Sequence, residues 1–264
     1  MNAQPDPIRV TVGYDYILVI EWLNVDERRR TGTELHARLQ AAHVPTRLCV
    51  CNSGEDVRRA LADAHREVRI QGVPAIQLET HGTDPFEGNP ADIAFGTRQE
   101  LVRWSTLGEW LAPLNAASGY RLLMVSAACW GSAVMAAMGG GEHPAAFAAA
   151  IGFRTRVTPG RLFDAMLELY RSLRRGESIQ ESVAGAQREL DAGQRLELEI
   201  AIPVAARILA GALREPLPRF RNAPLEPAQR IQVLRRPWDT WFPLALQEQQ
   251  PAYRFENILP MLDI

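Results

Sequence analysis

Lysine is absent from this 264-residue chain, so all 29 of its basic residues are arginines. The absence excludes several enzyme classes whose chemistry needs a lysine amine. P-loop nucleotidases hold phosphates with a lysine, pyridoxal enzymes form a Schiff base on one, and protein kinases pair one with their nucleotide. The triple glycine Gly139–Gly141 is therefore expected to be a loop and not a phosphate-binding motif.

The net charge and the number of cysteines are also low. A net charge of −2 and a pI near 6.2 give no reason to expect nucleic acid as a partner. Three cysteines, without a secretory signal at the N-terminus, indicate free thiols in a reducing cytoplasm. Cys49 and Cys51 flank Val50 and should face the same side of a strand as small buried hydrophobes. The five histidines form no zinc spacing with the cysteines, so we expect no metal and no other cofactor.

Charged residues are missing from Leu122 to Gly141, a run long enough to be considered as a membrane helix. The run is rich in Ala, Gly and Ser, however, and its hydrophobicity is therefore weak. It divides into a strand up to Ser126, a turn at Cys129 and a helix over about 132–138. We therefore expect no membrane span.

Apolar, β-branched runs alternate with amphipathic helical patterns along the first 190 residues. The predicted strands are Tyr16–Leu23, Arg47–Cys51, Ala75–Thr80, Leu122–Ser126 and Ala145–Phe153. Strands and helices that alternate at this spacing form βαβ units around a mostly parallel sheet. The pattern predicts an α/β protein, a three-layer α/β/α sandwich over residues 1–190.

The remaining residues, 191–264, are expected to form a C-terminal extension packed on this core. Within it, Leu196–Leu213 is apolar and is predicted to be helical, although Pro203 interrupts it. Several prolines and three aromatic clusters follow. No repeat or low-complexity segment is present.

Two of the predicted strands end at residues that can act as a nucleophile and a base. His81 follows the strand Ala75–Thr80, and Cys129 follows the strand Leu122–Ser126. The carboxyl ends of parallel strands meet at one edge of a sheet, so the two side chains should lie close together. A thiolate is a strong nucleophile, and an imidazole can activate it and protonate the leaving amine. The pattern predicts a cysteine peptidase with Cys129 and His81 as its catalytic residues.

His81-Gly82 and Ala128-Cys129, in their strand contexts, resemble the signature of the caspase-like (clan CD) cysteine peptidases. This superfamily includes caspases, metacaspases, separase and the bacterial CHAT-domain peptidases. The spacing agrees with the roughly 50 residues that separate histidine and cysteine in caspases. The resemblance implies a caspase-like sheet and an oxyanion hole formed by the backbone N–H groups of Gly82 and Cys129.

The pattern is most similar to CHAT domains. The similarity lies in Ile151–Phe153 and in the segment Leu169–Val183, and overall the resemblance covers about residues 16–190. It implies an endopeptidase that cleaves a protein partner in bacterial defence or regulated cell death, with a gasdermin-like effector as one candidate substrate. Two alternatives stay open. One is a caspase-like interaction module in which catalysis is secondary or lost, and the other is a different thiol enzyme, such as an amidase, with the same dyad.

Several residues are candidates for substrate recognition, with opposite preferences. The segment that begins at Arg30 resembles the caspase segment whose arginine binds an aspartate at P1. With Arg154 or Arg156 it would form a pocket for an acidic side chain. Asp84 and Glu87 would instead attract a basic P1 residue. An apolar or small P1 residue also remains open.

Metacaspases carry, two residues before the cysteine, an aspartate that favours a basic P1 residue. This chain has Ala127 at that position. Ala127 therefore gives no reason to expect the preference of metacaspases for a basic P1 residue.

Overall fold

The structure is a computed structural model that describes residues 12–83, 94–138, 144–202, 204–206, 209 and 227–259. Gly139–Gly141, Asp84 and Glu87, all considered above, lie outside the described residues, as does Pro203.

A mixed sheet forms the centre of the molecule, with the strand order β2-β1-β3-β6-β7-β8. Its strands are β1 (Tyr16–Trp22), β2 (Thr46–Val50), β3 (Pro74–Gly82), β6 (Leu123–Ser126), β7 (Ala149–Phe153) and β8 (Leu196–Ile200). All neighbours in this order pair in parallel except β7 and β8, which are antiparallel. A short hairpin of β4 (Ala94–Gly96) and β5 (Leu101–Arg103) pairs with the C-terminal end of β3.

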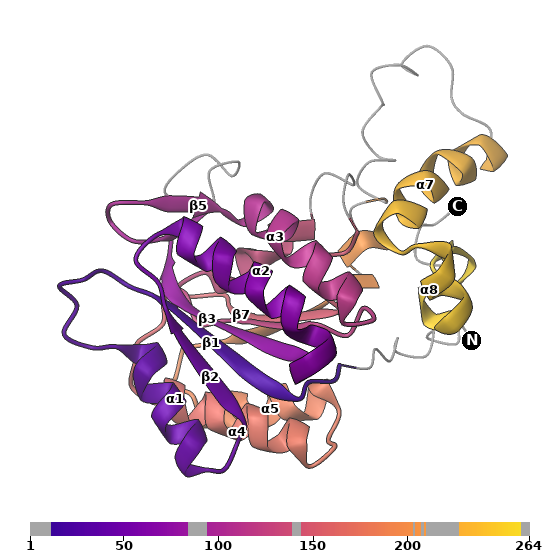
Figure 1. The fold of residues 1–264 in the computed structure, drawn as a ribbon. Coiled ribbons are helices and arrows are strands. Elements are labelled where there is room, and N and C mark those ends of the chain that lie inside the picture. The colour runs from indigo at the N-terminus through magenta and orange to yellow at the C-terminus, as the bar shows by residue number, and fades with distance from the viewer. Residues whose placement is uncertain are drawn as a thin grey trace.

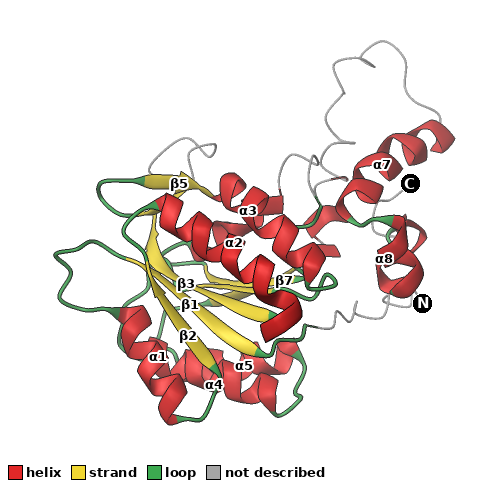
Figure 2. Cartoon of the chain, in the orientation of Figure 1, coloured by secondary structure: helices red, strands yellow, loops and turns green. Residues whose placement is uncertain are grey.

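Helices cover both faces of this sheet (Figures 1 and 2). One face carries α1 (Thr31–Ala41), α4 (Leu162–Arg174) and α5 (Ile179–Glu189), and the other carries α2 (Gly54–Gln71) and α3 (Trp104–Ala117). Two separate apolar clusters fill the spaces between these layers. Strand β1 is buried along its whole length because helices cover both of its sides. The predicted α/β/α sandwich with a mostly parallel sheet is confirmed.

Local sequence signals begin two of these helices. The Ser53 hydroxyl accepts a hydrogen bond from the backbone of Asp56 at the start of α2. At the start of α5, Ser178 and Glu181 form a reciprocal capping box. Between β6 and β7, a 3-10 helix, η2 (Gly131–Met138), follows the turn at Cys129.

The segment Leu196–Ile200 is strand β8, so the expectation of a helix beginning at Leu196 is wrong. Its sequence Leu-Glu-Leu-Glu-Ile alternates strictly, which is typical of a strand. The sheet thus includes residues that the sequence analysis assigned to the C-terminal extension.

The last described segment packs against the same layer as α2 and α3. It contains α7 (Pro227–Trp241), α8 (Leu244–Gln249) and two 3-10 turns, η4 (Pro251–Tyr253) and η5 (Phe255–Asn257). Trp238, Phe242, Tyr253 and Phe255 are buried in the larger apolar cluster of the core. None of the helices in the described part of the chain has the length and apolar character that crossing a bilayer requires.

Candidate active site

Strand β3 holds His81 at the place where its pairing changes. Up to Thr80 the strand pairs in parallel with β1, and then His81 and Gly82 pair antiparallel with Gly96 and Phe95 of β4. The hairpin therefore fixes the backbone of His81 beyond the edge of the parallel sheet. The His81 side chain is half exposed, with 49% of its surface accessible.

The turn after β6 holds Cys129. The backbone N–H of Ala127 still donates to the Leu78 carbonyl of β3, 2.9 Å away, so the chain leaves the sheet only after this residue. Trp130 then adopts a positive φ of 57°, and η2 begins. Gly131 packs on Ser126, because a Cβ there would lie 2.7 Å from the Ser126 hydroxyl. The tight turn needs glycine at this position and leaves Cys129 at its apex.

The end of β3 meets the turn after β6, and His81 and Cys129 line the same pocket of about 130 Å³. The segments are in close backbone contact: a Cβ built on Gly82 would lie 1.9 Å from the Cys129 carbonyl oxygen. Only glycine permits this approach. The N–H groups expected to form the oxyanion hole, those of Gly82 and Cys129, thus belong to two adjacent segments.

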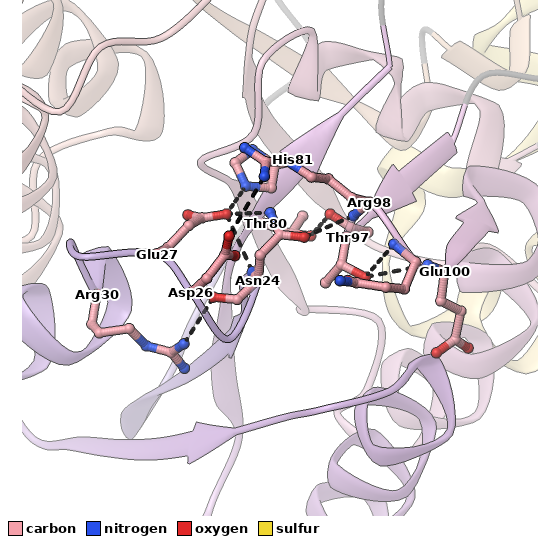
Figure 3. Close-up of polar contacts among 11 residues, drawn as sticks. Asn24, Asp26, Glu27, Arg30, Thr80, His81, Thr97, Arg98 and Glu100 are labelled. Atoms are coloured by element: carbon pink, nitrogen blue, oxygen red, sulfur yellow. Dashed lines mark hydrogen bonds and ion pairs between the residues drawn. The ribbon is translucent and has the colours of Figure 1, made fainter.

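A carboxylate that the sequence analysis did not identify contacts His81. Oε1 of Glu27 lies 2.5 Å from Nε2 of His81 (Figure 3). Asn24 donates to the same oxygen from its side chain and, over 3.2 Å, from its backbone N–H. Burial opposes ionisation of Glu27, but the hydrogen bonds from His81 and Asn24 outweigh it and lower its pKa below the usual value.

The Glu27 contact determines which nitrogen of His81 carries a proton. An ionised carboxylate can only accept, so Nε2 must donate to it. In the neutral ring Nδ1 then has the free lone pair that a general base needs. Asn24 is itself held by the Arg98 backbone N–H, which donates to its Oδ1 over 2.8 Å. Figure 3 shows this chain of contacts running from the β4–β5 connection through Asn24 to Glu27 and His81.

The sulfur of Cys129 lies against the segment after β7. The Val157 backbone N–H donates to Sγ over 3.4 Å, and the Val157 carbonyl is 3.9 Å from the same atom. Val157 and Pro159 also line the pocket, together with Leu162 at the start of α4. One wall of the pocket is therefore apolar.

The three arginines proposed for an acid-binding pocket are not among the residues that line this one. Nε of Arg30 lies 2.7 Å from Oε1 of Glu21, a carboxylate buried in β1. Arg154 is 73% exposed and lies 3.9 Å from Glu197 of β8. The structure thus brings His81, Gly82 and Cys129 together, but Arg30, Arg154 and Arg156 do not join them.

A second overlooked carboxyl, Glu79, also lines the pocket, two residues before His81. It is only 1% exposed, and Gln77 donates to it over 2.7 Å. Burial and the nearby charge of Glu21 raise the pKa of Glu79 to about 7, although hydrogen bonds from Thr31 and Gln77 oppose the shift. A glutamate inside a buried strand was the sequence signal for it.

A larger pocket of about 570 Å³ lies at the opposite edge of the sheet, where β1 and β2 begin. Tyr14, Pro45 and Arg174 line it, and its lining contains neither a cysteine nor a histidine. The smaller pocket therefore holds the reactive side chains.

The other two cysteines lie on β2 and just beyond it, and they belong to the apolar cluster of α2 and α3 and not to the lining of this pocket. Sγ of Cys49 and Sγ of Cys51 are 3.8 Å apart, as expected for residues that face the same side, and all three cysteines are free thiols. Cys51 is buried and Cys49 packs partly against the core.

The arrangement around Cys129 supplies a thiol, an imidazole held by a carboxylate, and a pocket with one acidic and one apolar side. In the described part of the chain, no group of three or more His, Cys, Asp or Glu side chains is placed to hold a metal ion. No protein-family model matches this chain, and no curated protein matches its sequence.

Proposed function

We propose that this chain is a caspase-like cysteine endopeptidase that cleaves a protein partner through Cys129 and His81. The observation that carries the proposal is that these two side chains line one pocket, on segments whose backbones approach closely at Gly82 and Cys129. The Glu27 contact adds support, because it leaves Nδ1 of His81 as the basic nitrogen.

The proposed reaction begins when Nδ1 of His81 takes the thiol proton of Cys129. The sulfur attacks the peptide carbonyl carbon, and the oxyanion that forms accepts hydrogen bonds from the N–H groups of Gly82 and Cys129. The imidazolium of His81 then gives its proton to the leaving amine, which leaves an acyl-enzyme. A water molecule, deprotonated by His81, hydrolyses this thioester and restores the thiol.

Glu27 acts in this scheme as a positioning residue. Its carboxylate holds the Nε2 proton in place and stabilises the imidazolium that forms during each half of the reaction. Asn24 fixes the carboxylate by two hydrogen bonds, so the ring is oriented before the substrate binds.

The biological setting follows from the resemblance to CHAT-domain peptidases. It supports a role in bacterial defence or regulated cell death, in the cytoplasm, with a gasdermin-like effector as one candidate partner. The interaction-module alternative predicts binding of a partner without cleavage, and the amidase alternative predicts hydrolysis of small amides but not of internal peptide bonds.

A thiol-directed peptidyl probe tests the proposal on the purified full chain. We expect it to label the wild type but neither Cys129→Ala nor His81→Ala, and a peptide library to be cleaved at internal bonds. Cys49→Ala is the matched control, because it removes a partly buried thiol that does not line the pocket. Labelling that persists in Cys129→Ala, or a complete lack of cleavage, would contradict the proposal.

A further inference from the structure

Two buried glutamates lie side by side beneath the pocket. Glu21 of β1 and Glu79 of β3 are partners in the parallel register, so their side chains emerge on the same face of the sheet. They are 0% and 1% exposed, respectively. A buried carboxylate is costly unless a cation or several donors satisfy it.

Glu21 has this compensation. Nε of Arg30 lies 2.7 Å from Oε1 of Glu21, and Thr33 donates its backbone N–H over 2.8 Å and its hydroxyl over 3.1 Å. Thr33 is in the first turn of α1, where the helix dipole also favours a negative charge. Arg30 is thus the ion-pair partner of Glu21.

Among the described residues the donors to Glu79 are neutral, namely the Gln77 amide and the Thr31 hydroxyl. Tyr170 of α4 lies behind them and donates to Gln77 over 2.6 Å. Among the described residues no arginine forms an ion pair with Glu79. The carboxyl therefore has no cationic partner in the described part of the chain, and the pocket that it lines is where a cation could reach it.

The pocket has room for such a partner above Glu79. Ala127 follows the register pair Leu78–Ser126 and lies beside Glu79 on the neighbouring strand, where its methyl group fills little space. Among the described residues, the other charged groups that line the pocket are Glu27, with His81, and Arg29. The Arg29 guanidinium is already paired with an acid, because its Nε lies 3.3 Å from Oε2 of Glu34. It also stacks over the Phe163 ring, 5.0 Å from the centroid.

We infer that this pocket receives the cationic side chain of an arginine or lysine at P1, with Glu79 as its ionic partner. The inference rests on the proposed function, which places the P1 carbonyl at Cys129. Leu23, Val157 and Leu162 would contact the apolar stem of the side chain, while its charged end meets the carboxyl. Glu79 ionises as the cation enters, because the pair then supplies the counter-charge that the empty site lacks.

A binding experiment tests the pocket without any need for catalysis. Full-length Cys129→Ala is titrated calorimetrically with the product-like peptides acetyl-Ala-Ala-Arg and acetyl-Ala-Ala-citrulline. Citrulline has nearly the shape of arginine but no charge, so the ratio of the two affinities isolates the ionic contact. We expect arginine to bind at least about tenfold more tightly, as a buried charge-assisted contact requires.

The ratio should also depend on pH and on Glu79. Raising the pH from 6 to 8 ionises Glu79 and increases the preference for arginine, while other effects of pH act on both peptides and cancel. Glu79→Gln, combined with Cys129→Ala, should reduce the ratio to near one. Glu248→Gln, an exposed change on α8, is the matched control and should keep the preference. Thermal unfolding of each variant shows whether it is folded.

A cleavage experiment separates this inference from the proposed function. Wild type is given coumarin amides of acetyl-Ala-Ala-Arg, acetyl-Ala-Ala-citrulline, acetyl-Ala-Ala-Asp and acetyl-Ala-Ala-Leu. Cleavage at Cys129 without a preference for arginine would overturn the inference and keep the peptidase. Selective binding of the arginine peptide to Cys129→Ala, with no amide cleaved by wild type, would keep the pocket and overturn the peptidase. A preference for Asp or Leu at P1 would overturn the inference as well.

Discussion

Oε1 of Glu27 lies 2.5 Å from Nε2 of His81, although 54 residues separate them in the chain. The loop after β1 thus contacts the end of β3, and the hydrogen bonds from Asn24 hold Glu27 there. The contact orients an imidazole that is otherwise half exposed. In the proposed mechanism it fixes the proton on Nε2 and keeps Nδ1 basic.

Replacement of Glu27 tests this relationship. Glu27→Gln retains a hydrogen-bond partner for His81 but loses the charge that stabilises the imidazolium, whereas Glu27→Ala loses both. We expect kcat for peptide cleavage to fall by about tenfold to hundredfold in Glu27→Ala and less in Glu27→Gln, with KM nearly constant. Steady-state kinetics measure this split.

Nitrogen NMR of the His81 ring provides a readout that a purely structural role would not change. The Nε2 resonance should shift in both variants, because its hydrogen-bond partner changes. Glu55→Gln on α2 is the control, since its exposed carboxylate pairs with Arg58 on the same helix. Wild-type kcat together with an unchanged ring spectrum in Glu27→Ala would rule out the positioning role.

The backbones of the two catalytic segments approach each other most closely at Gly82. A Cβ at this position would lie 1.9 Å from the Cys129 carbonyl oxygen, so Gly82→Ala must push the end of β3 away from the turn that holds Cys129. We expect the free energy of unfolding to fall by about 1–3 kcal/mol and peptide cleavage to be largely lost. Urea denaturation and the cleavage assay measure the two effects.

Gly185→Ala is the matched control for Gly82→Ala. A Cβ there meets side chains at ordinary distances of 3.7 Å, and alanine favours the helix α5 in which it lies. Its stability should equal or exceed that of the wild type. Equal behaviour of the two alanine variants would show that the backbone contact at Gly82 has no importance.

The strands of the sheet could be predicted because helices cover both of its faces. Buried parallel strands are then apolar on both sides, and runs such as Tyr16–Trp22 stand out from their surroundings. Strand β8 differs because it is antiparallel and ends the strand order, so its apolar residues alternate with glutamates and form no apolar run. The positions of His81 and Cys129 followed from the strand ends alone, since topology brings these ends to one edge.

Glu27 and Glu79 could not be predicted in the same way. Glu27 lies in a polar loop, and such charges are usually solvated, so its approach to His81 depends on a tertiary contact. Arg30, in the same loop, was expected to face the substrate but pairs with the buried Glu21. Glu79 was visible as a carboxyl inside a buried strand. Arg30 pairs with Glu21 and not with Glu79, however, and this choice depends on tertiary contacts that the sequence does not show.

Arg30 should therefore matter for stability. Arg30→Met leaves the Glu21 carboxylate buried with only the Thr33 donors, and we expect a loss of about 2–4 kcal/mol in the free energy of unfolding. Arg58→Met breaks an exposed pair with Glu55 and should leave the free energy of unfolding nearly unchanged. Urea denaturation compares the two.

The double variant Glu21→Gln with Arg30→Met extends this test. It removes the buried charge together with its partner, so it should recover part of the stability that Arg30→Met loses. If Arg30→Met were as stable as Arg58→Met, the pair with Glu21 would contribute nothing and Arg30 would be free for another role.

Glu79 should make the stability of the protein depend on pH. Its pKa is about 7 in the folded chain against 4.5 for an ordinary glutamate, so the folded state keeps a proton that the unfolded state has lost. Below pH 4.5 both states are protonated and Glu79 costs nothing. Between pH 4.5 and about 7 the cost of burying it grows, and above pH 7 it levels off at about 3 kcal/mol.

Glu79→Gln removes this titration. Urea denaturation of both proteins at pH 5 and pH 8 should show that the wild type loses about 2–3 kcal/mol relative to the variant over this range, because all other groups are common to both. The same pH dependence in both proteins would mean that Glu79 is already ionised and compensated. A cation in the pocket should have the opposite effect to rising pH. Acetyl-Ala-Ala-Arg, added to Cys129→Ala at pH 8, should therefore stabilise the fold more than acetyl-Ala-Ala-citrulline at the same concentration.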